Sequence, residues 1–242
     1  MQRFLLFLIV LSFALSACAA QPSATLSPTA MPTKDPIIED PAPAAATSEA
    51  TQAVQAAEPS SAVITFQIIP GESQVTYEVG ETFLSQGNVF NLAVGVTDQI
   101  SGDVTVDYTN PQNSTIGTIT IDISQFTSDS NRRDNTIRDR FLESSKYPQA
   151  TFTPTKIEAL PSIGEEGVDY SLKVTGDLKV KDTTKEVTFD VTVRLDGDSL
   201  TGTATTTILM SDFGVGPISI GGILETQDEA KLTLTFVARP AQ

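Results

Sequence analysis

The sequence predicts an all-β domain over residues 62–240, with about eight antiparallel strands and one short helix near 130–142. The first observation is that apolar and polar residues alternate from Val63 onward, which is the period of a strand with one buried and one wet face. The second is the short turns between these runs, of which Asp196-Gly197-Asp198 is a strong hairpin signal. The third is that the alternation of apolar and polar residues is interrupted once, at residues 130–142. An up-and-down barrel and a sandwich both satisfy this pattern of sequential neighbours.

The strand candidates follow one another with short connections. In chain order they fall at residues 66–68, 74–80, 101–108, 118–123, 150–157, 170–180, 187–195, 200–208 and 232–236. Gly176 falls in phase with the apolar residues of its run, which suggests a bend or a close approach of another chain segment. The length of this region requires one core and no second domain.

The interruption predicts a short helix. Asp129 and Ser130 can act as N-caps, and Ile137 and Phe141 fall on one side of a helix that begins there. Tyr147-Pro148 ends it, because the residue before a proline disfavours helical geometry.

Composition excludes several classes of function. The chain has no histidine and one cysteine, so triads that need histidine, His/Cys metal sites and intrachain disulfides are ruled out. No two carboxylates are placed to converge, so we expect no catalytic residues, no metal site and no cofactor apart from a bound lipid. The formal net charge of −15 gives no basic face for nucleic acid.

The first residues indicate export. Arg3 precedes an apolar run at 4–15 that is shorter than the 20 or so residues of a membrane span and suits a signal peptide. The next residues, Leu15-Ser16-Ala17-Cys18, resemble the lipobox of bacterial lipoproteins, which implies that Cys18 is acylated. We therefore expect a signal peptide at 1–17 and a protein anchored by lipid to the cell envelope, at the outer face of the cytoplasmic membrane or at the outer membrane.

Residues 18–61 are rich in alanine, proline, serine and threonine, with few large apolar residues, and this composition predicts a disordered tether. Residues 1–60 hold two basic and five acidic residues, so −12 of the net charge falls on residues 61–242. The acidity therefore belongs to the predicted domain.

Several stretches of the domain, taken together and in this order, resemble the YceI-like family of lipid- or polyisoprenoid-binding proteins. They are Arg133-Asp134-Asn135 with the Tyr147-Pro148 junction, Val174-Thr175-Gly176-Asp177-Leu178-Lys179-Val180 with Thr184-Lys185-Glu186-Val187, and Ser211-Asp212-Phe213-Gly214. Met210 departs from the family, which commonly has a basic residue there. The resemblance implies a lipocalin-like barrel with an amphiphilic lipid as its ligand.

If the barrel forms, the apolar residues in phase should line its interior and mouth. They are Phe66, Val75, Tyr77, Phe83, Phe90, Val104, Val106, Ile119, Ile121, Phe152, Leu172, Val174, Leu178, Phe189, Val191, Val193, Ala204, Phe213, Leu234 and Phe236. Small residues at Gly117, Gly176, Gly202 and Ala204 should leave volume for a ligand. Arg133, Asp134 and Asp212 are candidates for the lipid head group, although pairing or capping at the helix is the more common role of the first two.

Two functions remain open. The first is a non-enzymatic, membrane-anchored protein that holds a polyisoprenoid, an isoprenoid quinone or a fatty acyl chain. The second is a solid β-domain that acts as an interaction module for an envelope protein or a polysaccharide, which predicts a filled interior and an exposed apolar patch around 83–92.

Overall fold

The structure is a computed structural model that describes residues 63–242. The predicted signal peptide, Cys18 and the predicted tether lie outside the described residues. Among the described residues, no helix has the length and apolarity to cross a membrane.

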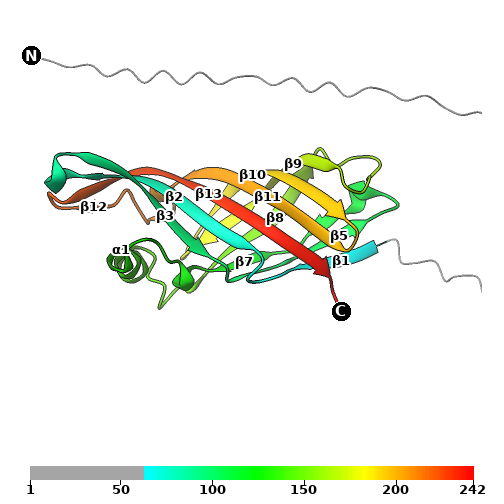
Figure 1. Cartoon of the computed structure of the whole chain (residues 1–242), viewed down its shortest axis with the longest axis horizontal. Helices are drawn as coiled ribbons and strands as arrows, with labels where there is room; N and C mark the ends of the chain where they lie inside the picture. Colours follow the sequence, from blue (N-terminus) through cyan, green and yellow to red (C-terminus); the bar gives the residue numbers. More distant parts are fainter. Residues whose placement is uncertain (1–62) are drawn as a thin grey trace, which may run out of the picture. The chain divides into compact units, whose positions relative to one another are not determined.

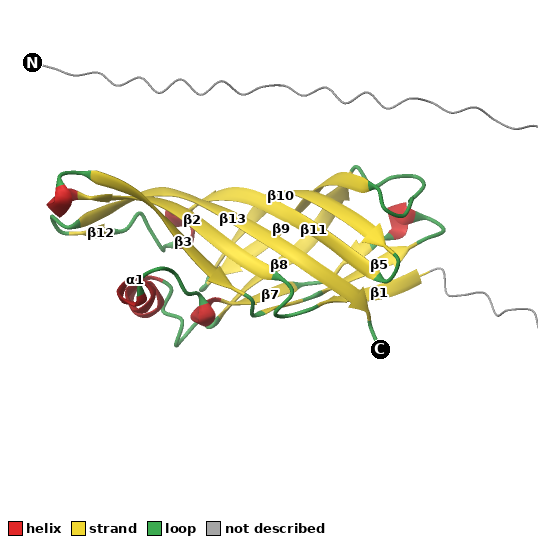
Figure 2. Cartoon of the chain, in the orientation of Figure 1, coloured by secondary structure: helices red, strands yellow, loops and turns green. Residues whose placement is uncertain are grey.

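Strands dominate the described residues, as Figure 2 shows in yellow. The strands are β1 Val63–Ile68, β2 Gln74–Phe83, β3 Val89–Thr97, β4 Ile100–Ser101, β5 Asp103–Asp107, β6 Thr115–Ile116, β7 Ile119–Asp122, β8 Gln149–Glu158, β9 Asp169–Val180, β10 Thr183–Asp196, β11 Ser199–Leu209, β12 Ser219–Ile220 and β13 Leu224–Pro240. The helical segments are η1 Leu84–Gln86, η2 Pro111–Asn113, η3 Ile123–Gln125, α1 Asn131–Thr136, η4 Ile137–Phe141 and η5 Met210–Phe213.

The strands form one curled antiparallel sheet, which confirms the predicted all-β, lipocalin-like class (Figure 1). Its main order is β4-β7-β8-β9-β10-β11-β13-β1-β5-β6, and β2 joins β13 with β3 beyond it. The sheet of residues 63–242 has thirteen strands rather than about eight. β4, β6 and β12 have two residues each, which no alternation pattern can reveal, and the nine-residue β3 was not among the predicted strands.

The longest strand, β13, is the strand at which the sheet branches. One of its edges pairs with β11, and its other edge is shared between β2 near Leu224 and β1 near Pro240. The register to β2 shifts between Thr226 and Ala230, which is a bulge. Such a bulge bends a strand and lets the sheet curl.

The predicted helix is present as α1, which continues into one π-helical turn, η4. Ser130 is its N-cap, and its hydroxyl oxygen accepts a hydrogen bond from the Arg133 backbone N–H at 3.4 Å. This short segment lies beside the end of the sheet that holds β12 and the β2–β3 hairpin, and β1 and β5 lie at the other end (Figure 1).

The main core is a cluster of buried apolar side chains from most strands, among them Phe66, Phe152 and Phe236. Val79, Met210 and Ala230 form a second, smaller cluster. Residues 63–242 supply the thirteen-stranded sheet and the main core. A domain that contains its own core can fold alone, so a fragment of residues 55–242, which includes all of them, is suited to experiments on the barrel.

Candidate ligand-binding cavities

Two apolar cavities lie end to end inside the curled sheet. The helix-end cavity, next to α1 and the β2–β3 hairpin, has a volume of about 450 Å³. The loop-end cavity, next to η2 and the β8–β9 loop, has a volume of about 250 Å³. The larger one is in the usual size range of small-molecule sites.

The two cavities share four lining residues, and these define a waist. They are Val75 on β2, Ile121 on β7, Leu178 on β9 and Leu232 on β13. All four are branched aliphatic side chains, so the passage from one cavity to the other is apolar. A hydrocarbon chain that crosses this waist would meet no polar group there.

Polar groups lie at the outer ends of the cavities, and the two ends differ in charge. Asp107, Glu165 and Glu166 contribute to the loop-end lining. Arg132, Arg133 and Glu81 contribute to the helix-end lining. The loop-end rim is therefore acidic, and the helix-end rim carries guanidinium groups.

Glu81 is the buried charge of the helix-end cavity, with 3% of its surface exposed. Its Oε1 accepts hydrogen bonds from Arg133 Nη2 at 2.6 Å and from Asn91 Nδ2 at 2.7 Å. Arg133 also pairs with Asp129. Burial lowers the pKa of Arg133, but the bonds to Glu81 and Asp129 raise it overall. The guanidinium therefore stays charged and joins α1 to β2.

Tyr77 lines the same cavity and packs edge-on against Phe126, with ring centroids 5.1 Å apart. Burial, together with the nearby charge of Asp134, raises the pKa of Tyr77 to about 12. The phenol is therefore a neutral lining group at physiological pH.

Eighteen of the twenty predicted lining residues do line one of the two cavities. Phe66 does not, because it is fully buried within the packed core beside the loop-end cavity. Phe90 is on the outer face of β3 and is 60% exposed. The hairpin register explains this position, because it pairs Phe90 with Thr82, out of phase with the inward side chains of Glu81 and Phe83.

The three head-group candidates separate in the structure. Arg133 lines the helix-end cavity but is already engaged by Glu81 and Asp129. Asp134 lines neither cavity. It is 3% exposed and accepts bonds from the Ser128 backbone N–H at 3.1 Å and the Ser128 hydroxyl at 2.5 Å. Asp212 also lines neither cavity and faces Lys185 at 3.3 Å on the surface.

The expectation that the glycines leave free volume is wrong. A Cβ at Gly202 would lie 2.7 Å from the Phe236 ring, and a Cβ at Gly176 would lie 2.9 Å from the Phe152 ring. A Cβ at Gly117 would meet the Asp103 carboxylate at 2.5 Å. At Gly176 and Gly202 the atoms nearest to such a Cβ are backbone oxygens, Thr153 O and Thr192 O, each at 2.5 Å, so these glycines allow close approach of neighbouring segments and leave no free volume.

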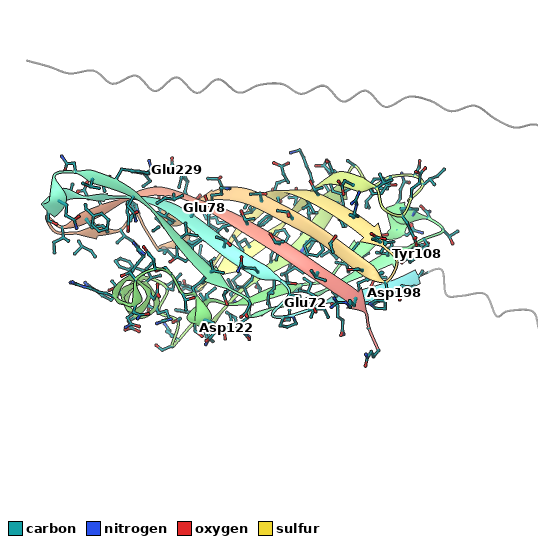
Figure 3. The ribbon with its side chains drawn as sticks, viewed as in Figure 1. Glu72, Glu78, Tyr108, Asp122, Asp198 and Glu229 are labelled. Carbon is teal, nitrogen blue, oxygen red and sulfur yellow. The ribbon has the colours of Figure 1, made fainter. Side chains whose placement is uncertain are left out.

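The loop-end rim is seen in Figure 3, where Tyr108 and Asp198 lie together at the end of the sheet away from α1. Burial, followed by the charges of Glu166 and Asp198, raises the pKa of Tyr108. This rim is therefore an acidic surface around an apolar opening.

Sequence reasoning missed two charged residues of the helix-end cavity, Glu81 and Arg132. Glu81 had a usable signal, because it continues the inward phase of Val75, Tyr77 and Val79 on β2. A charge at an inward position indicates a partner or a site. Among residues 63–242, no group of three or more Asp, Glu, His or Cys side chains could hold a metal ion.

The curled antiparallel sheet with an apolar interior open toward polar rims defines a lipocalin-type binding fold. Comparison with known proteins identifies the family within this class. Residues 66–238 match the profile of the YceI-like domain, and the chain belongs to this family.

Curated relatives agree with this assignment. A UPF0312 protein of Pseudomonas putida is 34% identical over 130 residues, which cover 51% of this chain and 64% of the relative. Protein YceI of Escherichia coli O17:K52:H18 is 36% identical over 109 residues, covering 43% of this chain and 50% of the relative. The chain thus spans less than two thirds of the length of these relatives.

Solved structures show the same fold. The crystal structure of Burkholderia cenocepacia BcnA has a TM-score of 0.55 and 25% identity, covering 70% of this chain and 98% of BcnA. A Saccharophagus degradans domain described as polyisoprenoid-binding and implicated in plant cell wall breakdown also has a TM-score of 0.55, at 13% identity, covering 74% of this chain and 99% of that domain.

Proposed function

We propose that this chain is a non-enzymatic envelope lipoprotein that binds an amphiphilic lipid inside its barrel. The observation that carries the proposal is the pair of apolar cavities that meet at the waist of Val75, Ile121, Leu178 and Leu232. Such an interior fits a long hydrocarbon chain, and a polyisoprenoid, an isoprenoid quinone or a fatty acyl chain supplies one. The polyisoprenoid-binding description of the Saccharophagus degradans neighbour is consistent with this ligand class.

Burial of the chain supplies the binding free energy. Each buried methylene contributes about 0.8 kcal/mol, so a chain that fills both cavities needs no strong polar contact to stay bound. The interaction-module alternative expects a filled interior, and two cavities of about 450 and 250 Å³ argue against it.

The test is to purify residues 55–242 and to analyse them by native mass spectrometry, followed by solvent extraction of any bound lipid. We expect a co-purifying lipid, or a rise in melting temperature when a polyisoprenoid or a long-chain fatty acid is added, because a ligand of the native state stabilises it. Absence of both would overturn the proposal. A water-soluble short-chain acid serves as the control ligand.

The anchor is a separate part of the proposal. The lipobox-like Leu15-Ser16-Ala17-Cys18 supports acylation of Cys18, and residues 19–62 would then connect the anchor to β1. Metabolic labelling with palmitate in a bacterial host should mark the wild-type chain and leave Cys18→Ala unlabelled. Label that survives the substitution would contradict the anchor without affecting the lipid-binding proposal.

A further inference from the structure

One end of the barrel exposes apolar side chains beside a cavity mouth. Val89, Phe90, Leu92 and Val94 on β3, with Ile223 before β13, form what we call the β3 patch, and each is more than a third exposed. The outward residues Phe90 and Leu92 lie on β3, which within residues 63–242 pairs in a ladder with β2 alone. Large apolar groups gathered on a surface in this way mark an interaction site.

The β3 patch is continuous with the rim of the helix-end cavity. Val89 pairs with Phe83, which lines the cavity, so Val89 lies on the cavity face of the β2–β3 hairpin, and Phe90, Leu92 and Val94 lie on its outer face. Ile223 is itself both 47% exposed and part of the lining. Its carbonyl oxygen accepts a hydrogen bond from the Leu84 backbone N–H at 2.9 Å, so the β2–β3 hairpin and the turn before β13 form one tip. Whatever covers the patch therefore lies against the mouth.

Arginines lie beside the same mouth. The α1–η4 segment, residues 131–141, carries four arginines and two aspartates in a chain with an excess of acidic residues. Arg132 and Arg140 are exposed and take part in none of the ion pairs among residues 63–242, and Arg132 contributes to the rim. Free guanidinium groups next to apolar side chains match a surface of anionic lipid head groups.

The opposite end has the opposite character. Its loops at 107–114, 158–170 and 194–199 hold seven carboxylates and one arginine. An anionic membrane repels that end, so the charge distribution orients the helix end toward the bilayer.

The length of the chain outside the described residues permits this orientation. β1 begins at Val63, opposite Asp107, which is at the acidic end. β13, 17 residues long, spans about 56 Å at roughly 3.3 Å per residue. The 44 residues between Cys18 and Val63 reach at most about 150 Å. A barrel anchored at Cys18 can therefore turn its far end toward the same membrane.

We infer that the β3 patch and the neighbouring arginines dock the helix-end mouth on an anionic bilayer surface, so that a lipid passes between membrane and cavity without crossing water. The purpose of this contact rests on the proposed lipid-binding function. Docking on the membrane is measured without a lipid bound in the barrel. A failure of docking therefore does not imply a failure of lipid binding, and the reverse also holds.

The experiment is co-flotation of residues 55–242 with vesicles of phosphatidylethanolamine and phosphatidylglycerol. The variant Phe90→Ser/Leu92→Ser should bind roughly tenfold more weakly, because it removes two insertable side chains. The matched control is Ile163→Ser, which removes a 74% exposed apolar side chain from the β8–β9 loop and should leave binding unchanged. Unchanged melting temperatures verify that each variant folds.

A second pair of variants tests the charge. Arg132→Glu should weaken binding about tenfold on anionic vesicles and little on phosphatidylcholine vesicles, and the exposed Lys179→Glu on the outer face of β9 is its control. The inference is overturned if Ile163→Ser lowers binding and the β3 variant does not. It is overturned equally if wild type does not float, or if sedimentation shows that the β3 variant dissociates a dimer while vesicle binding persists.

Discussion

At the residue scale, Tyr77 shows how the cavity changes the chemistry of one side chain. Burial and the charge of Asp134 raise its pKa from 10.0 to about 12. The folded state therefore holds the phenolic proton more tightly than the unfolded chain. The corresponding stabilisation is complete below pH 10 or so and is lost as the pH rises through about 12. In an alkaline absorbance titration of the four tyrosines, we expect the last phenol to ionise to be absent from Tyr77→Phe. An unchanged last transition would assign it to another tyrosine.

Gly202 gives a second prediction at this scale. It pairs with Phe236 across β11 and β13, and a Cβ there would lie 2.7 Å from the Phe236 ring and 2.5 Å from the Thr192 carbonyl oxygen. Gly202→Ala should therefore cost about 1–3 kcal/mol of unfolding free energy, as overpacked cores do, in urea denaturation. Gly221→Ala, where nothing lies within 4 Å, is the control. Equal stability of the two variants would show that the ring moves aside freely.

The same residues show where sequence reasoning stops. Alternation placed most inward side chains correctly, because the side-chain period of a strand is two. It indicated a close approach at Gly176, but it could not show which segment approaches Gly176 or Gly202, since that depends on which strand lies alongside. Phe90 was misplaced for a related reason. The register of the β2–β3 hairpin decides which face it occupies, and that register depends on the conformation of the turn at residues 84–88, which the alternation pattern does not show.

At the element scale, α1 is joined to the sheet by one buried ion pair. Arg133 on α1 contacts Glu81 on β2 at 2.6 Å, with exposed fractions of 14% and 3%. Removal of the guanidinium leaves a buried carboxylate uncompensated, so Arg133→Leu should cost up to about 3–5 kcal/mol. The double variant Arg133→Leu/Glu81→Leu should recover most of this loss. Urea denaturation of the two single variants and the double variant measures the coupling.

The neighbouring Arg132→Leu is the matched control for this cycle. It removes an exposed guanidinium that forms no ion pair with the part of the chain that the structure describes, and it should change the unfolding free energy by no more than about 0.5 kcal/mol. If the unfolding free-energy changes of the two single variants add up to that of the double variant, Glu81 and Arg133 are not coupled. The sequence predicted this helix from its N-cap and its apolar side. It did not predict the connection to β2, because Glu81 and Arg133 are 52 residues apart.

At the scale of the whole molecule, the alternation pattern predicted the fold class, whereas the hollow interior was expected from the family resemblance and not from the pattern itself. Strands leave a local alternation pattern in the sequence, but the curvature of the sheet that they form does not. The cavities depend on how the sheet curls, and bulges, which bend strands, lie between Thr226 and Ala230 on β13 and between Pro154 and Lys156 on β8. None of these features has a local sequence signal. Two-residue strands such as β4 and β12 were missed for the same reason, since two residues show no period.

Because the two cavities meet at the waist, the longest hydrocarbon chain that the barrel can bury depends on both cavities together. Leu178 on β9 is 4% exposed and lines both cavities, so Leu178→Trp should block the passage between them. We expect the variant to keep its affinity for a chain short enough for the helix-end cavity and to lose roughly tenfold or more for a long one, because methylenes beyond the waist are no longer buried. Calorimetric titration with fatty acids of increasing length measures this difference. Lys179→Trp, which adds the same ring on the outer face of β9, is the control. If Leu178→Trp weakens short and long chains equally, the two cavities do not act as one site.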